Sequence, residues 1–313
     1  MIVPSTAWRT LLTVFVALTA AGCSYGGGQP GRGSTALDVR PLSGATAISH
    51  ADAVRLHDRE ERAVAACMRA RGQRYTAQPR TASARSEETN PYGLLTSRKA
   101  AQDGYGIVGE YVYRLTAPAP ADEPRGTVWQ QALTGTPAHR VSLRLPDGVS
   151  LEYSTDGCVA RARAEVYGAD WNTVEPLTVG LANRVIAAVE ADPGHRAAVR
   201  RWSACMTRAG HPAKDLQAPR EAIDSRLRTA VSESSTGPDQ DALHALGRDE
   251  IRTARADADC QGATGLAEAV RKVQQAVEKS LLTEHDRKTV AAYVADRRRA
   301  LAAEAGPPSP NGG

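Results

Sequence analysis

The stretch CMRARG at residues 67–72 returns as CMTRAG at residues 205–210, so the pattern Cys-Met-x-x-x-Gly occurs twice. Each copy follows apolar residues at helical spacing, and in the second copy Trp202, Cys205 and Met206 share one helical face. Each copy ends in glycine, the residue that commonly terminates a helix in a left-handed conformation. The repeat therefore predicts two similar helix ends, each with an inward-facing cysteine.

A second cysteine follows each copy of the repeat, shortly after an aspartate. The sequence reads DGC at residues 156–158 and DC at residues 259–260. Two similar halves are implied. Apart from Cys23, four cysteines remain, an even number that favours disulfide pairing in an oxidising compartment.

Four cysteines allow three connectivities. The repeat favours the pairs Cys67–Cys158 and Cys205–Cys260, because each half then closes its own loop. On the chain-entropy model, loops of this length stabilise a fold by roughly 4 kcal/mol each. The other two connectivities remain open at this point.

A zinc site built from the same cysteines is the rival interpretation. Such sites usually take two ligands from a short Cys-x-x-Cys step, and the sequence contains no such step. The 7 histidines are scattered, and no two are placed for helical metal ligation. We therefore expect no metal site and no cofactor.

Helical periodicity predicts a mainly α fold with one small β-hairpin, in which residues 139–145 and 149–154 alternate around a Pro-Asp-Gly turn. The expected helices are 51–71, 97–103, 158–167, 175–190, 194–209, 221–231, 240–259, 265–282 and 284–302. The last two predict a C-terminal helical hairpin, with Thr283 and Asp286 in a capping arrangement. Loops are expected at residues 76–89, 116–125 and 232–238.

Several segments resemble a group of uncharacterised actinobacterial, streptomycete-type secreted lipoproteins with repeated Cys-Met-x-x-x-Gly motifs. Besides the repeat and the later cysteines, the matching segments are LHDREE at 56–61, NPYGL at 90–94, GYG at 104–106, the Tyr-Gly at 167–168 and TGL at 264–266. The resemblance covers roughly residues 56–270. It implies an extracytoplasmic address and the same cysteine plan, and it implies no catalytic activity.

The N-terminus resembles a bacterial lipoprotein signal. An apolar run at residues 11–21 precedes Gly22 and Cys23, and it is shorter than the roughly 20 residues that a membrane-spanning helix needs. The resemblance implies cleavage before Cys23 and a diacylglyceryl group on its sulfur, although Ala20 stands where such signals more often have leucine. An ordinary secretory signal with an incidental cysteine is the alternative.

These features predict a five-part organisation. We expect a signal peptide at residues 1–22 and a flexible, lipid-anchored linker at 23–47. The disulfide-closed body follows in two related halves, at 48–170 and 171–305, and a disordered tail occupies 306–313. The protein is then expected on the outer face of the cytoplasmic membrane, held there by lipid.

Glycines 104, 106 and 109 spell Gly-x-Gly-x-x-Gly, but a dinucleotide site needs a strand before that motif and a helix after it. Here a short helix is expected before the motif, and residues 110–113 are expected to be extended. We therefore interpret the glycines as turn residues.

No catalytic residue is assigned from the sequence. His57, Asp58 and Glu60 could in principle form an acid–base group, but a solvated helix face explains them better. The chain lacks the Gly-x-Ser-x-Gly and Ser-x-x-Lys signatures of serine enzymes. The basic run at residues 297–299 suits either a polyanion or a helix C-terminus, and Trp129 and Trp171 are undecided between ligand stacking and core.

Composition excludes one broad class of partner. The chain of 313 residues carries 39 Lys+Arg against 35 Asp+Glu, interspersed, so nothing marks a nucleic-acid binder. The expected function is that of a lipid-anchored, non-enzymatic binding or structural protein of the cell envelope, whose partner is an envelope protein or a cell-wall polymer. A secreted hydrolase or transferase with an unfamiliar site is the alternative.

Overall fold

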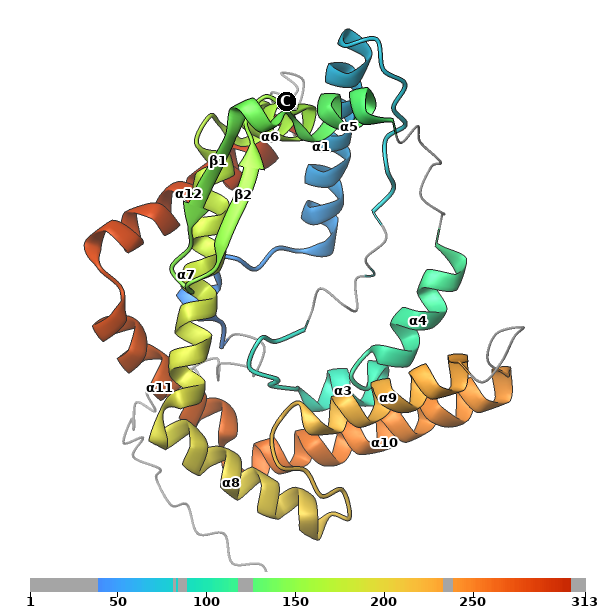
Figure 1. The fold of residues 1–313 in the computed structure, drawn as a ribbon. Helices are drawn as coiled ribbons and strands as arrows, with labels where there is room; N and C mark the ends of the chain where they lie inside the picture. The colour runs from blue at the N-terminus through green and yellow to red at the C-terminus, as the bar shows by residue number, and fades with distance from the viewer. Residues whose placement is uncertain (1–38, 81–82, 84–88, 118–125, 233–238, 305–313) are drawn as a thin grey trace, which may run out of the picture. The chain divides into compact units, whose positions relative to one another are not determined.

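The computed structural model describes residues 39–80, 83, 89–117, 126–232 and 239–304. In this part of the chain, helices predominate and one strand pair accompanies them, which confirms the expected mainly α fold (Figure 1). The helices are α1 (His50–Ala70), α3 (Ser97–Asp103), α4 (Ile107–Thr116), α5 (Thr127–Thr134), α6 (Cys158–Tyr167), α7 (Trp171–Ala191), α8 (Pro193–Arg208), α9 (Ala218–Ser232), α10 (Gln240–Thr264), α11 (Leu266–Leu281) and α12 (Glu284–Glu304). The strands are β1 (Arg140–Arg144) and β2 (Ser150–Ser154).

Several expectations fall outside the described residues. These are the signal peptide at 1–22, the lipidated Cys23, the tail at 306–313 and most of the loops expected at 76–89, 116–125 and 232–238.

The two copies of the repeat end their helices in the same way. The carbonyls of Met68 and Met206 each accept a hydrogen bond at 2.9 Å from the backbone N–H five residues further on. Gly72 and Gly210 hold φ of 70° and 80°, which glycine adopts without strain. Both methionines are fully buried. The repeated sequence thus encodes a glycine-terminated helix end anchored by a buried methionine.

Two disulfides join the four body cysteines in the pairing that the repeat favours. Cys67 near the end of α1 bonds to Cys158 at the start of α6, and Cys205 of α8 bonds to Cys260 of α10. In both bridges the Cα atoms lie 5.6 Å apart. The two halves differ at the second cysteine, which begins a helix in one and lies near the end of a long helix in the other.

The largest hydrophobic core forms around α7, α8 and α11. Val39 and Leu42 belong to it, because a 3-10 turn at Pro41–Gly44 packs that segment against the helices. The Leu42 N–H donates to Glu278 at 2.7 Å, and the Arg40 carbonyl accepts from Gln274 at 2.8 Å. The linker expected at 23–47 is therefore wrong at its C-terminal end, since residues 39–47 already belong to the folded body.

A second core lies among α3, α4, α9 and α10. Its member α4 corrects the sequence analysis, which expected an extended segment at residues 110–113. Four aromatic and β-branched residues in seven favoured a strand, but tertiary packing outweighs that propensity: Val108 is buried and Ile107 and Tyr111 pack against the cluster. Helix α5 was likewise not expected.

The two sequence halves exchange elements across the expected boundary at residue 170. Helices α3 and α4 from the first half pack on α10 of the second, and α12 from the second half packs on α1, α6 and α7. The described residues accordingly fall within one compact unit. The halves are related by their repeat and disulfides, and their cores are shared.

The strand pair lies along α7 (Figure 1). The strands are antiparallel, with Val141 opposite Tyr153 in the register. Tyr153 shares a hydrogen bond of 3.3 Å with Thr173, and Asn183 donates to Asp147 in the turn at 3.0 Å. These two contacts attach both ends of the expected β-hairpin to the helix.

The C-terminal helices α11 and α12 follow one another through a short turn, as expected. Thr283 and Asp286 cap α12 reciprocally: the Thr283 N–H donates to the Asp286 carboxylate at 2.9 Å, and the Asp286 N–H donates to the Thr283 hydroxyl at 3.1 Å. Helix α12 packs mainly on α7, and α11 packs on both α7 and α8. This packing brings the face of α12 that carries Tyr293 onto the start of α7.

Candidate ligand pocket

Four helices converge on one polar cavity of about 310 Å³. Each contributes a pair of polar or aromatic lining residues one helical turn apart: His57 and Glu60 from α1, Arg163 and Tyr167 from α6, Trp171 and Glu175 from α7, and Tyr293 and Arg297 from α12. Helix α1 adds the apolar Ala53 and Leu56. Side chains three or four positions apart lie on the same helical face. We call this cavity the four-helix pocket; its size is at the lower end for small-ligand sites.

Three stacked aromatic rings form one wall of the four-helix pocket. Trp171 lies between Tyr167 and Tyr293, with ring centroids 4.0 and 5.0 Å away and interplanar angles of 13° and 16°. Both faces of the indole are covered, so Trp171 does not offer a face for stacking a sugar. Its Nε1–H is buried and has no hydrogen-bond partner among the described residues. A buried donor of this kind is costly unless something accepts from it.

Arg163 organises the carboxylates of the pocket. Its guanidinium pairs with Glu175 at 2.9 Å and lies 3.8 Å from Glu60, while its own Nε is buried without a hydrogen-bond partner among the described residues. The Tyr167 hydroxyl donates to Glu60. Burial and the neighbouring Glu60 raise the pKa of Tyr167 above its usual value, so the hydroxyl keeps its proton and acts as a donor. Both carboxylates are thus already engaged.

Arg297 supplies a positive charge beside the aromatic wall. Its guanidinium carbon lies 5.1 Å from the centre of the Tyr293 ring, and one of its N–H groups donates to the Tyr293 hydroxyl at 3.2 Å. Within the described part of the chain, Arg297 forms no ion pair with a carboxylate. Its remaining N–H donors are therefore available to an acceptor in the pocket.

His57 lies in the pocket with a fixed ring orientation. Its Nε2 is 2.8 Å from the Gln78 carbonyl, which can only accept, so Nε2 is the donor of this hydrogen bond. Asp58 is exposed and does not line the pocket. The structure therefore brings His57 and Glu60 together and leaves Asp58 out.

None of the described residues that line the four-helix pocket is a serine, threonine, cysteine or lysine. Its two glutamates are held by Arg163 and Tyr167. What the arrangement offers is a set of N–H donors around a polar cavity, the guanidinium of Arg297 foremost among them. Such a cavity suits a ligand group rich in acceptor oxygens.

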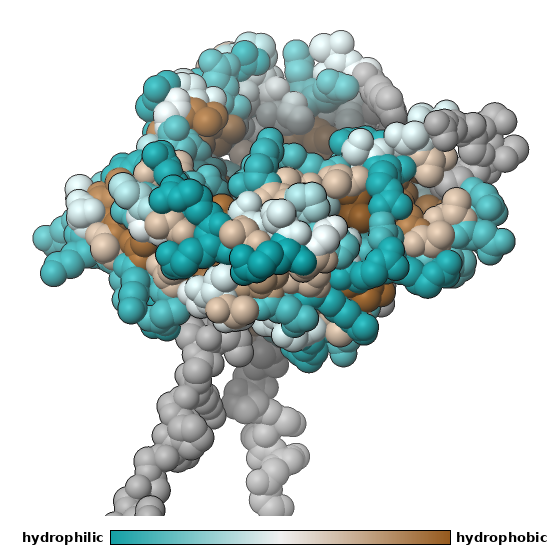
Figure 2. Space-filling view, turned by 90° about the horizontal axis from the view of Figure 1, so that it is seen from below, coloured by the Kyte–Doolittle hydropathy of each residue, from teal (hydrophilic) through white to brown (hydrophobic). Residues whose placement is uncertain are grey.

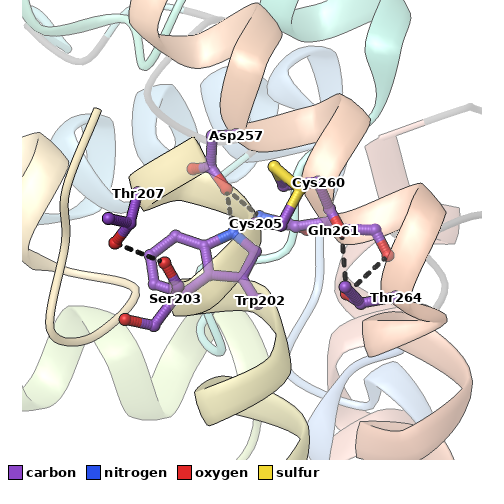
Figure 3. Close-up of a disulfide and its surroundings, with 8 residues drawn as sticks. All are labelled: Trp202, Ser203, Cys205, Thr207, Asp257, Cys260, Gln261 and Thr264. Carbon is purple, nitrogen blue, oxygen red and sulfur yellow. Dashed lines mark hydrogen bonds between the residues drawn. A yellow bond between two sulfur atoms is a disulfide. The ribbon is translucent and has the colours of Figure 1, made fainter. Parts of the chain in front are cut away.

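A second polar cluster is buried beside the Cys205–Cys260 disulfide (Figure 3). Asp257 is fully buried and accepts hydrogen bonds from Trp202 Nε1 at 2.8 Å, Gln261 Nε2 at 2.9 Å and the Tyr105 hydroxyl at 3.2 Å. Arg220 lies 3.8 Å from the same carboxylate. Burial raises the pKa of Asp257, and these partners counter part of that shift. The cluster is saturated by the protein itself and is structural.

The glycine motif at residues 104–109 binds an internal carboxylate. Glu250 of α10 is buried and accepts from the backbone N–H groups of Tyr105 at 3.0 Å, Ile107 at 2.8 Å and Val108 at 3.0 Å. A Cβ on Gly104 would lie 2.8 Å from the Glu250 side chain. Gly104 and Gly106 are turn residues, as expected, whereas Gly109 lies inside α4. The backbone N–H groups that could bind an anion are already occupied by the protein's own side chain.

The remaining residues considered in the sequence have structural roles. Trp202 is fully buried, and Trp129 donates through Nε1 to the Arg74 carbonyl at 2.8 Å while stacking near Tyr75. In the basic run, Arg297 alone lines the pocket; Arg298 is exposed and Arg299 pairs with Asp296. The exception to the expected surface histidines is His195, which is 7% exposed; burial lowers its pKa.

Comparison of the chain with protein-family models, with curated proteins and with solved structures finds no match. None of the described helices is both long and apolar enough to cross a membrane. Among the described residues, no cluster of three or more histidine, cysteine, aspartate or glutamate side chains is placed to hold a metal ion.

The sequence analysis did not identify the four-helix pocket, although one signal was present. Arg163 with Tyr167, Trp171 with Glu175, and Tyr293 with Arg297 each place an aromatic residue four positions from a charged one. That spacing predicts a shared helical face for each pair. It does not predict that three such faces meet, because their meeting depends on how α6, α7 and α12 pack.

Proposed function

We propose that this protein is a lipid-anchored, extracytoplasmic binding protein of the cell envelope, and that the four-helix pocket holds an anionic group of its ligand. The observation that carries the proposal is the Arg297 guanidinium, which lines the cavity and forms no ion pair with a carboxylate in the described part of the chain. A carboxylate or phosphate accepts hydrogen bonds from such a donor. Cell-wall polymers and envelope proteins both carry such groups.

Hydrolysis or group transfer is the second candidate, because His57 and Glu60 do line a cavity together. Binding is favoured over catalysis for a geometric reason. Glu60 accepts from Tyr167 and lies beside Arg163, and His57 Nε2 donates to a backbone carbonyl, so neither is poised beside a side-chain nucleophile.

The ligand proposal is tested with inorganic phosphate and acetate as probes, measured by calorimetry at low salt on the full-length protein. We expect Arg297→Gln to weaken binding of the preferred probe about tenfold, the effect of losing one charge-assisted hydrogen bond. Arg298→Gln is the matched control, because Arg298 is the exposed neighbour on the same helix. If neither probe binds, or if both variants weaken binding equally, the pocket is not the anion site.

The anchor is tested by mass spectrometry of the protein from its native membranes. We expect the mature chain to begin at Cys23 with a diacylglyceryl adduct, and Cys23→Ser to retain residues 1–22, since the peptidase acts on the lipid-modified cysteine. An unmodified Cys23, or a wild-type peptide that still contains residues before it, would overturn the anchor. The outcome is independent of the ligand test.

A further inference from the structure

The C-terminal half of α4 carries an unusual group of exposed apolar side chains. Val112, Tyr113 and Leu115 are 44%, 37% and 63% exposed, and between them the Arg114 side chain is 64% exposed. Other large exposed apolar residues in the described chain, such as Val128, occur singly on their elements. Contiguous exposed apolar residues on a soluble domain mark a surface that something covers.

Two grooves flank this helix end. One runs between α4 and α9 with a volume of about 630 Å³, and the other between α4 and α10 with about 710 Å³. Leu115 and Tyr111 line both, together with Leu227 and Val231 in the first and Leu243 and Ile251 in the second. On the face shown in Figure 2, polar side chains predominate and apolar areas are separate from one another, so such an apolar ridge is not general to the surface.

Cations border the same surface. Arg114 and Arg228 line the groove beside α9, where they pair with Glu110 at 3.6 Å and with Asp224 at 2.8 Å. Arg248 lines the groove beside α10. Arg248 forms no ion pair with any carboxylate in the described part of the chain. Protein segments that lie in the headgroup region of a bilayer combine tyrosine and arginine with apolar side chains, and their arginines contact anionic lipid.

We infer that the Val112–Leu115 end of α4 inserts into the outer leaflet of the membrane that holds the lipid anchor, a second contact besides Cys23. This inference rests on the proposed anchor. The tether from Cys23 to the first packed residue, Val39, spans at most about 50 Å when extended, so the body stays close to that leaflet. The two acyl chains of a diacylglyceryl group already anchor the protein stably, so the α4 contact sets the orientation of the body on the leaflet and does not supply the attachment itself.

The test uses full-length lipidated protein in vesicles of phosphatidylcholine and phosphatidylglycerol, with a nitroxide attached to Leu115→Cys. The collision rates of the nitroxide with oxygen and with a water-soluble nickel chelate are measured. We expect frequent collisions with oxygen and few with nickel, at a depth of about 5 Å below the headgroups. A nitroxide on Val128→Cys is the matched control, because Val128 is equally apolar, 70% exposed and not on α4; it should remain open to nickel.

Each other outcome overturns the insertion. Nickel access at residue 115 equal to that at residue 128 means that α4 stays in water. Low access to both reagents at residue 115 means that another protein or a second copy covers the patch. If the protein does not enter the vesicles at all, the anchor itself fails, which distinguishes that failure from failure of the α4 contact.

Discussion

Asp257→Ala lowers the free energy of unfolding by about 4 kcal/mol, the usual cost of removing one partner from a buried charged pair. The substitution leaves Trp202 Nε1, Gln261 Nε2 and the Tyr105 hydroxyl without this acceptor, and it leaves the Arg220 guanidinium without its carboxylate. Each is a donor, and a stranded buried donor keeps its full desolvation cost. Urea unfolding followed by far-ultraviolet circular dichroism measures the loss.

The control for this experiment is Asp259→Ala. Asp259 lies on the same helix, carries the same charge and directly precedes Cys260, but its side chain is exposed. We expect its effect to stay within about 0.5 kcal/mol. Equal effects of the two substitutions would show that helix charge, and not the buried network, accounts for the loss.

Cys67→Ala combined with Cys158→Ala is expected to cost about 4 kcal/mol, because the disulfide closes a loop with a sequence separation of 91 residues. Alanine is used because Cys158 is fully buried and a serine hydroxyl there would need a partner. Equilibrium unfolding with the Cys205–Cys260 disulfide intact gives the difference from wild type. We expect the denaturant concentration at the midpoint of unfolding to fall, in addition to any change in the slope of the free energy against denaturant.

A second measurement separates the loss of the cross-link from the loss of packing. The wild type with only the Cys67–Cys158 bond reduced, a species isolated by its mass, should unfold at nearly the same urea concentration as the double variant. If that reduced protein keeps the full wild-type stability while the double variant loses several kcal/mol, the cysteines stabilise the fold by packing alone, and the loop-closure argument is wrong.

The sequence analysis favoured the correct cysteine pairs, but it drew attention to the wrong aspartate beside Cys260. It singled out Asp259 because that residue immediately precedes Cys260, whereas the buried acid is Asp257. Trp202 and Asp257 each lie three residues before a bridged cysteine, so the disulfide and the Trp202–Asp257 hydrogen bond join the same two helices one turn apart. Helical spacing from the cysteine would have indicated Asp257; adjacency in sequence did not.

Helix α4 and the four-helix pocket were missed for a related reason. The β-branched and aromatic residues of α4 carry a local preference for strand, and the helix exists because α9 and α10 pack against it and Glu250 binds its first N–H groups. In the pocket, Trp171 was undecided because the indole's role depends on which rings cover it. Tyr167 was four residues away in the sequence, but Tyr293 lies on α12.

The repeated Cys-Met-x-x-x-Gly motif predicts the end of a helix, but it does not predict which helices pack together. By itself the sequence determined the mainly helical class and the two glycine-terminated helix ends, and it favoured the cysteine pairs that the structure contains, because these depend on spacing along one helix and on loop closure. Tertiary structure decided which faces meet: α3 and α4 on α10, and α12 on α1 and α6, across the boundary expected at residue 170. The pocket arises from that meeting, because its donors lie on four helices whose packing no local pattern specifies.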